Sequence, residues 1–209
     1  MKECEKQIET ILKEYTETLP QGVVLKDCER TKKVMGKKTR ISIDIEEYAY
    51  KLWGVNLMHI PGISDAALLR LVGELGHDFT DKFNSCKEFC CWANVTPNNK
   101  ISGGKLLSSK VPKRKNQVGL ILRASANSLK ANKTPLRCYF RRMQAKSGYI
   151  SAIIATANKL GRIIYTMVKS KTEFDESFIS INEEERLRRK LIKTQKELEK
   201  MQNKLNRCA

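Results

Sequence analysis

Apolar residues recur every three or four positions along most of the chain, the spacing of one face of an α-helix. Within residues 3 to 19 the repeat comprises Cys4, Ile8, Leu12, Tyr15 and Leu19. We therefore predict an N-terminal helix that forms the end of a short coiled coil over residues 1 to 20. Residues 21 to 43 show no such period and contain Gly22 and Gly36, so we interpret them as a linker.

A helix-hairpin-helix is predicted at about residues 57 to 76, within a larger helical region that spans residues 44 to 175. Asp44 is placed to cap the first helix of that region. A tight turn at Pro61 and Gly62 then precedes a helix that Ser64 or Asp65 would cap, with Ala66, Ala67, Leu68 and Leu71 facing inward. The free backbone N–H groups at Gly62 and Ser64 suit a DNA phosphate, although many such hairpins are only structural.

Further helices are expected over "DKFNSCKEFCCWANV", from Gln117 to Ala131, from Pro135 onward, and over "GYISAIIATANKLGRIIYTMVKS". Residues 98 to 116 lie between two of them and are predicted as a loop or hairpin, because Asn, Gly, Ser and Pro interrupt the stretch. In residues 176 to 209, Leu191, Leu198 and Leu205 form a short heptad pattern, which predicts a coiled-coil tail that dimerises or packs on the N-terminal helix. The fold class is thus mainly α.

Basic residues are concentrated in one part of the chain. From Phe89 to Thr172 there are 17 Lys and Arg residues and no Asp or Glu, whereas the other 23 basic residues are matched by the chain's 23 acidic residues. The net charge of +17 therefore comes from a single window, which indicates a nucleic-acid partner. No apolar run is long enough to span a membrane and no signal peptide begins the chain, so we expect a cytoplasmic protein with reduced thiols and no membrane partner.

The cluster "CKEFCCW" places Cys86, Cys90 and Cys91 close together and invites a zinc interpretation. A zinc site of this kind needs a second Cys or His pair at finger-like spacing, and His77 is the only histidine nearby. We therefore expect a cluster of cysteines on a helix that faces the core of the protein, rather than a metal site.

Several spaced motifs resemble one known family. The stretches "IPGIS", "WANVTPNN", "SGGK", "NKTPL" and "ATANKLGRIIYTMV" run, over residues 57 to 175, in the order found in insertion-sequence transposases of the IS-one-ten type, the bridge-RNA-guided recombinases. The resemblance implies DNA transposition and recombination through a covalent phosphoserine link, with a structured guide RNA as partner and a homo-oligomeric assembly.

The resemblance places the family's serine on Ser102, which the residues alone would favour as a turn or capping serine. The proposed DNA- and phosphate-binding set then comprises Gly103, Gly104, Lys105, Lys110, Lys113, Arg114, Lys115, Asn116, Arg123, Arg141 and Arg142. Asn116 and Arg123 fall on the family's Asn and Arg, whereas Lys115 stands where a Gly commonly precedes that Asn. Ser108 and Ser109 are interpreted as phosphate-contacting or turn residues.

The family's acidic, RuvC-like nuclease domain is not recognised in the residues that precede the match. We therefore expect this chain to be incomplete without such a domain, which would bring the divalent metal, Mg²⁺, that the resemblance implies; no cofactor or metal is assigned to the chain itself. An alternative function is a nucleic-acid-binding remnant or regulator without catalysis. A serine hydroxyl is a poor nucleophile without a base, and the residues offer no evident base near Ser102.

Overall fold

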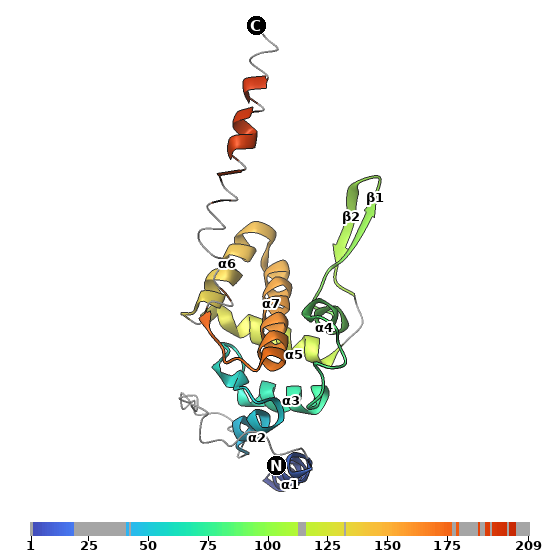
Figure 1. Ribbon diagram of the computed structural model, residues 1–209, viewed down its shortest axis with the longest axis vertical. Helices are drawn as coiled ribbons and strands as arrows, with labels where there is room; N and C mark the ends of the chain where they lie inside the picture. The colour runs from blue at the N-terminus through green and yellow to red at the C-terminus, as the bar shows by residue number, and fades with distance from the viewer. Residues whose placement is uncertain are drawn as a thin grey trace. The chain divides into compact units, whose positions relative to one another are not determined.

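The computed structural model describes residues 2–18, 41, 43–112, 116–131, 133–176, 179, 188, 191–192, 194–199 and 201–203. They belong to two units, residues 1–174 and 175–209, which are treated separately. The structure is mainly α-helical, as predicted. The elements are α1 (Lys2–Glu17), α2 (Ile45–Trp53), the 3-10 turn η2 (Leu57–His59), α3 (Asp65–Leu75), α4 (Cys86–Trp92), β1 (Asn98–Ser102), β2 (Lys105–Lys110), α5 (Gln117–Ser128), the 3-10 turn η3 (Leu129–Ala131), α6 (Pro135–Ser147) and α7 (Tyr149–Ser170) (Figure 1).

Serine side chains cap the first turns of α3 and α4. The Ser64 hydroxyl accepts a hydrogen bond from the Ala67 amide at 3.3 Å, and the Ser85 hydroxyl accepts one from the Glu88 amide at 3.2 Å. Each satisfies an N–H group that has no partner within its own helix. Pro135 occupies the first turn of α6, where its missing N–H costs nothing. Asp44 is the N-cap residue of α2, as predicted, although its side chain makes no capping hydrogen bond.

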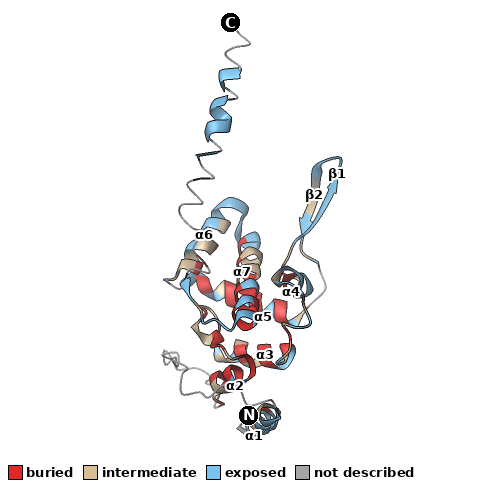
Figure 2. Ribbon diagram, in the orientation of Figure 1, coloured by how far each residue is buried: buried red, intermediate tan, exposed pale blue. Residues whose placement is uncertain are grey.

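The core of the first unit lies around α7. Leu160, Ile164 and Met167 of this helix are fully buried, and they pack with buried residues of α4 and α5. Phe89 lies at the centre of an aromatic cluster, with ring centroids 5.4 Å from Phe79 and 5.5 Å from Phe83. Burial is concentrated in α2, α3, α5 and α7, while the β-hairpin and much of α6 are exposed (Figure 2). The apolar faces predicted by the helical repeat therefore meet in one interior.

Two glycines allow the helices of this core to approach closely. A Cβ added to Gly161 on α7 would lie 3.2 Å from the Cys90 sulfur and 3.3 Å from a Leu122 methyl carbon. A Cβ added to Gly119 on α5 would lie only 2.0 Å from the Ala93 carbonyl oxygen. Real side chains do not reach such a distance, so α5 can begin where it does only with glycine at position 119.

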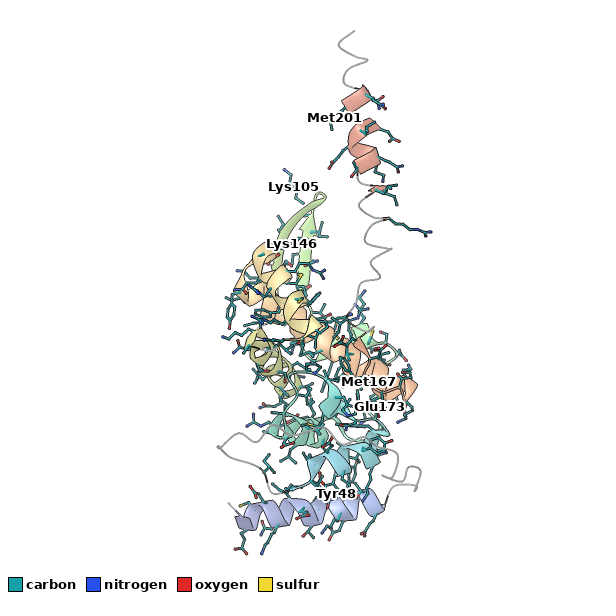
Figure 3. The ribbon with its side chains drawn as sticks, turned by 90° about the vertical axis from the view of Figure 1, so that its left-hand side faces the viewer. Tyr48, Lys105, Lys146, Met167, Glu173 and Met201 are labelled. Carbon is teal, nitrogen blue, oxygen red and sulfur yellow. The ribbon has the colours of Figure 1, made fainter. Side chains whose placement is uncertain are left out.

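The chain segment after α7 returns to the start of the helical region. The Glu173 carboxylate accepts a hydrogen bond from the Asn56 backbone N–H, at 3.0 Å to Oε1, and lies 3.3 Å from the His59 ring. Asn56 is itself buried and donates to Glu46 Oε1 at 2.7 Å. Figure 3 labels Glu173 near Met167 of α7. These bonds connect the end of the basic window with α2 and η2.

The first helix of the predicted helix-hairpin-helix is not observed. The segment before Pro61 is the 3-10 turn η2, because α2 already ends at Trp53 and Gly54 adopts a left-handed conformation with φ of 67°. The second helix, α3, is present with Ser64 as its cap. Leu68 and Leu71 are buried as expected, whereas the expectation for two alanines was wrong: Ala66 is exposed and Ala67 is only half-buried.

The described residues include only part of each predicted terminal coiled coil. Helix α1 is present, with Leu12 buried and Ile8 exposed, and Tyr15 donates or accepts a 2.8 Å hydrogen bond with His77 Nδ1. In the second unit, residues 194–199 and 201–203 are helical, and Leu191, Leu198 and Met201 are more than half exposed. Leu19, Leu205 and most of the predicted linker lie outside the described residues. Coiled-coil pairing therefore stays a prediction.

Within the described part of the chain, no helix has the length and apolar character to cross a membrane.

Candidate nucleic-acid interface

Ser102 is the last residue of β1 and precedes the tip of an antiparallel β-hairpin. It pairs with Lys105 in β2, and Gly103 and Gly104 form the two-residue connection. Both glycines have positive φ, +55° and +73°, the combination required by a type I′ hairpin turn. No described atom lies within 4 Å of a Cβ built on either glycine. Glycine is thus needed at these two positions for its backbone conformation and not for lack of space. The turn presents Ser102 and Lys105 to solvent.

The hairpin carries exposed cations along its length. Lys100, Lys105 and Lys110 are all exposed, and Lys105 lies at the hairpin tip (Figure 3). All of β1 is exposed as well, including the side chain of Ser102. An exposed arm with lysines and no acid matches a phosphate backbone electrostatically. Lys113, Arg114 and Lys115, which the sequence also assigns to phosphate binding, lie outside the described residues.

The base of the hairpin is anchored by three polar side chains that the sequence motifs supply from different helices. Asn116, the N-cap of α5, donates from Nδ2 to the Trp92 carbonyl oxygen at 3.1 Å. The Arg123 guanidinium donates to the Asn94 carbonyl oxygen. Asn158 on α7 donates to the Thr96 hydroxyl at 3.0 Å and, more weakly, to the Val95 carbonyl oxygen at 3.4 Å.

These bonds solve a local problem at the end of α4. The last carbonyl groups of a helix have no partners within it, and the chain here leaves α4 through Asn94 in a left-handed conformation with φ of 55°. Side chains from α5 and α7 supply the missing donors to this connection, which we call the 92–97 connection. Because β1 follows directly, the same bonds hold the base of the Ser102 hairpin on the core.

Two predicted phosphate ligands therefore have structural partners. The Asn116 side chain both donates to Trp92 and accepts from the Gly119 amide at 3.1 Å. Arg123 is half-buried on α5, with its Nε buried and unpartnered among the described residues. Sequence reasoning did not assign a role to Asn158 or Thr96, although both lie in motifs that were singled out. Asn158 lies in the middle of α7 and Thr96 lies four residues after α4, so no local signal marks them as partners, and only the fold brings them together.

The other predicted phosphate contacts lie away from the hairpin in sequence. Arg141 and Arg142 are exposed on α6, and the Arg142 guanidinium lies 5.4 Å from the centre of the Tyr139 ring. A Cβ added to Gly62 would lie 2.9 Å from the Ser125 carbonyl oxygen, so this turn packs against α5. The Ser64 hydroxyl is engaged in capping α3. Phosphate contact at Gly62 and Ser64 thus stays a prediction.

The three clustered cysteines are separated by the helix that carries them. Cys90 is buried and Cys86 half-buried, whereas Cys91 is exposed, so the expectation that the cluster faces the core was wrong for Cys91. Burial raises the pKa of the Cys90 thiol to about 12, which keeps it protonated at neutral pH. The described residues contain no group of three or more His, Cys, Asp or Glu side chains that could hold a metal ion. The described residues therefore offer no ligand set for the Mg²⁺ that the resemblance implies.

Comparison with known proteins identifies one similarity. Residues 55–135 match the model of the transposase IS116/IS110/IS902 family. The matched segment begins just before η2 and ends at the start of α6, so it includes the hairpin, Ser102, Asn116 and Arg123. No curated protein matches the chain significantly. The family match supports a transposase domain over these residues, and with it an interaction with DNA.

Proposed function

We propose that this chain supplies the serine-bearing domain of a DNA transposase that recombines an insertion sequence, with Ser102 as the nucleophile. The observation that carries the proposal is the position of Ser102: it lies next to the tip of an exposed, lysine-bearing hairpin within the segment that matches transposases. A nucleophile that must reach a phosphodiester in a bulky duplex needs such an accessible place. Guide-RNA binding and a homo-oligomeric assembly are part of the same proposal.

The chemistry is a transfer of the DNA phosphoryl group to serine. A bond forms between Ser102 Oγ and phosphorus, and one P–O bond of the DNA backbone breaks. The hydroxyl proton passes to a base, and the departing deoxyribose oxygen gains a proton. Lys105, which pairs with Ser102, and Lys100, two residues before it, would offset the negative charge of the transferring phosphoryl group. We assign the base to an acidic nuclease domain acting together with this chain.

The 92–97 connection has a positioning role in this proposal. Attack on phosphorus requires the hydroxyl to be aligned to within a fraction of an ångström, and a hairpin with a loose base would not achieve this. Asn116, Arg123 and Asn158 hold that base through hydrogen bonds from two helices of the core. Arg123 and Asn116 would thereby serve the reaction by positioning the hairpin, and phosphate contact by either side chain stays a prediction.

The direct test is covalent trapping. The full chain, combined with an acidic nuclease domain of the same type and end-labelled DNA, should yield a DNA–protein adduct that survives denaturation and maps to Ser102. Ser102→Ala should abolish the adduct while DNA affinity stays within about twofold. Ser170→Ala, which removes another exposed serine at the end of α7, is the matched control and should leave the adduct unchanged.

An equally abundant adduct from Ser102→Ala would overturn the assignment of the nucleophile. Salt-dependent DNA binding without any adduct, under conditions in which the added nuclease domain is active, would favour the alternative function. In that case the chain is a nucleic-acid-binding regulator or remnant. Both functions share the loss of affinity with salt that counterion release causes, so salt dependence alone does not separate them.

A further inference from the structure

A groove of about 900 Å³ lies between the base of the hairpin, α6 and α7. Its floor and walls are mainly apolar: Tyr139 and Met143 come from α6, and Ile150, Ile154 and Ala155 come from α7. Hydroxyl and amide groups are interspersed at Thr96, Ser109, Ser147, Ser151 and Asn158. Lys110 is the one charged residue of the lining, and it is also the one lining residue that belongs to the predicted phosphate-binding set.

The charge around this groove restricts its occupant. Every lining residue belongs to the window from Phe89 to Thr172, which contains 17 basic residues and no acidic one. Arg142 lies beside the Tyr139 ring, and exposed Lys146 directly precedes Ser147 (Figure 3). The fitting partner is therefore negatively charged outside the groove and apolar within it. An acidic polymer with flat apolar groups has this character, and nucleic acid is that polymer.

The apolar lining distinguishes between paired and unpaired nucleotides. In a duplex the faces of the bases are covered by stacking, and only phosphates, sugars and base edges meet a protein. An unpaired base exposes both faces, which pack well on a tyrosine ring, a thioether and aliphatic side chains. Its polar edge can meet hydroxyl and amide groups, while its phosphate lies near Lys110. The groove therefore offers a matching group for each part of an unpaired nucleotide: apolar side chains for the base faces, hydroxyl and amide groups for the base edge, and Lys110 for the phosphate.

We propose that the groove between the hairpin base, α6 and α7 binds unpaired DNA nucleotides, with bases against Tyr139, Met143 and Ile150 and the backbone along Lys110. DNA is chosen over RNA because the transposase family match, which includes the hairpin, supports an interaction with DNA. The proposal rests on the DNA interaction of the proposed function but not on the serine chemistry. It would give the hairpin a second role, in which its base holds a single strand while its tip reaches the phosphodiester.

Ile150→Glu is the discriminating variant. Ile150 is 77% exposed, so its replacement should not affect folding. The substitution replaces an apolar side chain of the groove lining with a carboxylate, which repels the DNA backbone. Ile11→Glu on α1 is the matched control, because Ile11 is 63% exposed, lies outside the groove and gives the same change in net charge. Fluorescence anisotropy of the full chain would compare labelled oligodeoxythymidine, oligouridine and a duplex of equal length.

The expected result is a loss of affinity for oligodeoxythymidine of about tenfold or more with Ile150→Glu, as the removal of one base-stacking contact entails. Affinity for the duplex should fall no more than it does with Ile11→Glu. Photocross-linking with 5-iododeoxyuridine in the single strand should place adducts at Tyr139 or Met143. Equal losses for single strand and duplex, preferential binding of oligouridine, or cross-links confined to residues outside the groove would each overturn the proposal.

The outcome is separable from that of the proposed function. Ser102→Ala should bind oligodeoxythymidine as the unchanged chain does. A missing covalent adduct with intact, Ile150-dependent binding of the single strand would refute Ser102 as nucleophile and retain the groove. Capture of a protein segment in the groove, with no binding of single-stranded DNA, would refute the groove assignment and leave the serine chemistry to its own assay.

Discussion

Asn158 on α7 donates a hydrogen bond of 3.0 Å to the hydroxyl of Thr96, although 62 residues separate the two positions. The bond joins the longest helix of the core to the 92–97 connection, from which the hairpin with Ser102 emerges. Each partner belongs to a different motif of the sequence, "ATAN" and "VTPNN". Their meeting gives both motifs one structural purpose, which is to fix the base of the arm that carries the proposed nucleophile.

The coupling between these two residues can be measured directly. Asn158→Ala and Thr96→Val should each lower the free energy of unfolding, and a double-mutant cycle should return a coupling of about 0.5–1.5 kcal/mol, as expected for one hydrogen bond. Urea unfolding of the four proteins gives the values. Additive effects of the two substitutions would show that the bond contributes nothing to the stability of the fold.

Two glycines provide a pair of opposite predictions. Gly119→Ala should lower the free energy of unfolding by about 1–3 kcal/mol or more, because the new Cβ would collide with the Ala93 carbonyl oxygen of the backbone. Gly73→Ala is the control within α3, where no described atom lies within 4 Å of the new Cβ. It should raise the free energy of unfolding by about 0.5–1 kcal/mol, since alanine is the better helix former. Thermal unfolding would show midpoints that move in opposite directions, and a Gly119→Ala protein as stable as the original would contradict the close contact.

Arg123 and Arg142 should separate stability from DNA binding. Arg123→Gln should cost about 1–2 kcal/mol of unfolding free energy, because the Asn94 carbonyl oxygen loses its donor at a half-buried position. Arg142→Gln, at an exposed position on α6, should change stability by less than about 0.5 kcal/mol. If Arg142 binds phosphate, the slope of log K against log salt for duplex DNA should become shallower by about 0.9.

The measurements are urea unfolding and anisotropy titrations at several salt concentrations. A stable Arg123→Gln protein that has lost DNA affinity and salt dependence would restore Arg123 to the role of phosphate ligand that the sequence assigns to it.

The raised pKa of Cys90 predicts a pattern of thiol reactivity. At pH 8 an alkylating reagent should modify exposed Cys4, Cys91 and Cys138 within minutes but leave Cys90 unmodified until the protein unfolds, because burial disfavours its thiolate. The folded pKa lies above that of the unfolded chain, so the stabilising contribution is complete below about pH 9. It is lost as the pH rises from there toward the folded value of about 12. Mass spectrometry of peptides after timed labelling tests this pattern, and equal rates for Cys90 and Cys91 would contradict it.

Sequence by itself was sufficient for the parts of this protein that depend on neighbouring residues. The helical repeats, a cap at Ser64 or Asp65, a loop or hairpin over residues 98 to 116 and the acid-free window are all local properties, because capping bonds, backbone conformation and charge are determined over a few positions. The mainly α fold follows from them. Local signals also misled: the segment before Pro61 looked helical but is a single 3-10 turn, since α2 had already ended at Trp53, and Ala66 and Ala67 are not buried.

Only the tertiary structure decided which polar side chains serve the fold and which remain for a ligand. Asn116 and Arg123 carry the charge or hydrogen-bonding capacity of phosphate ligands, yet each has a backbone carbonyl of the 92–97 connection as its partner. The groove beside the hairpin base likewise combines residues from three segments that are far apart in the chain. Hydrogen bonds and cavities between distant segments depend on how the helices pack, and the identity of a residue does not reveal its partner.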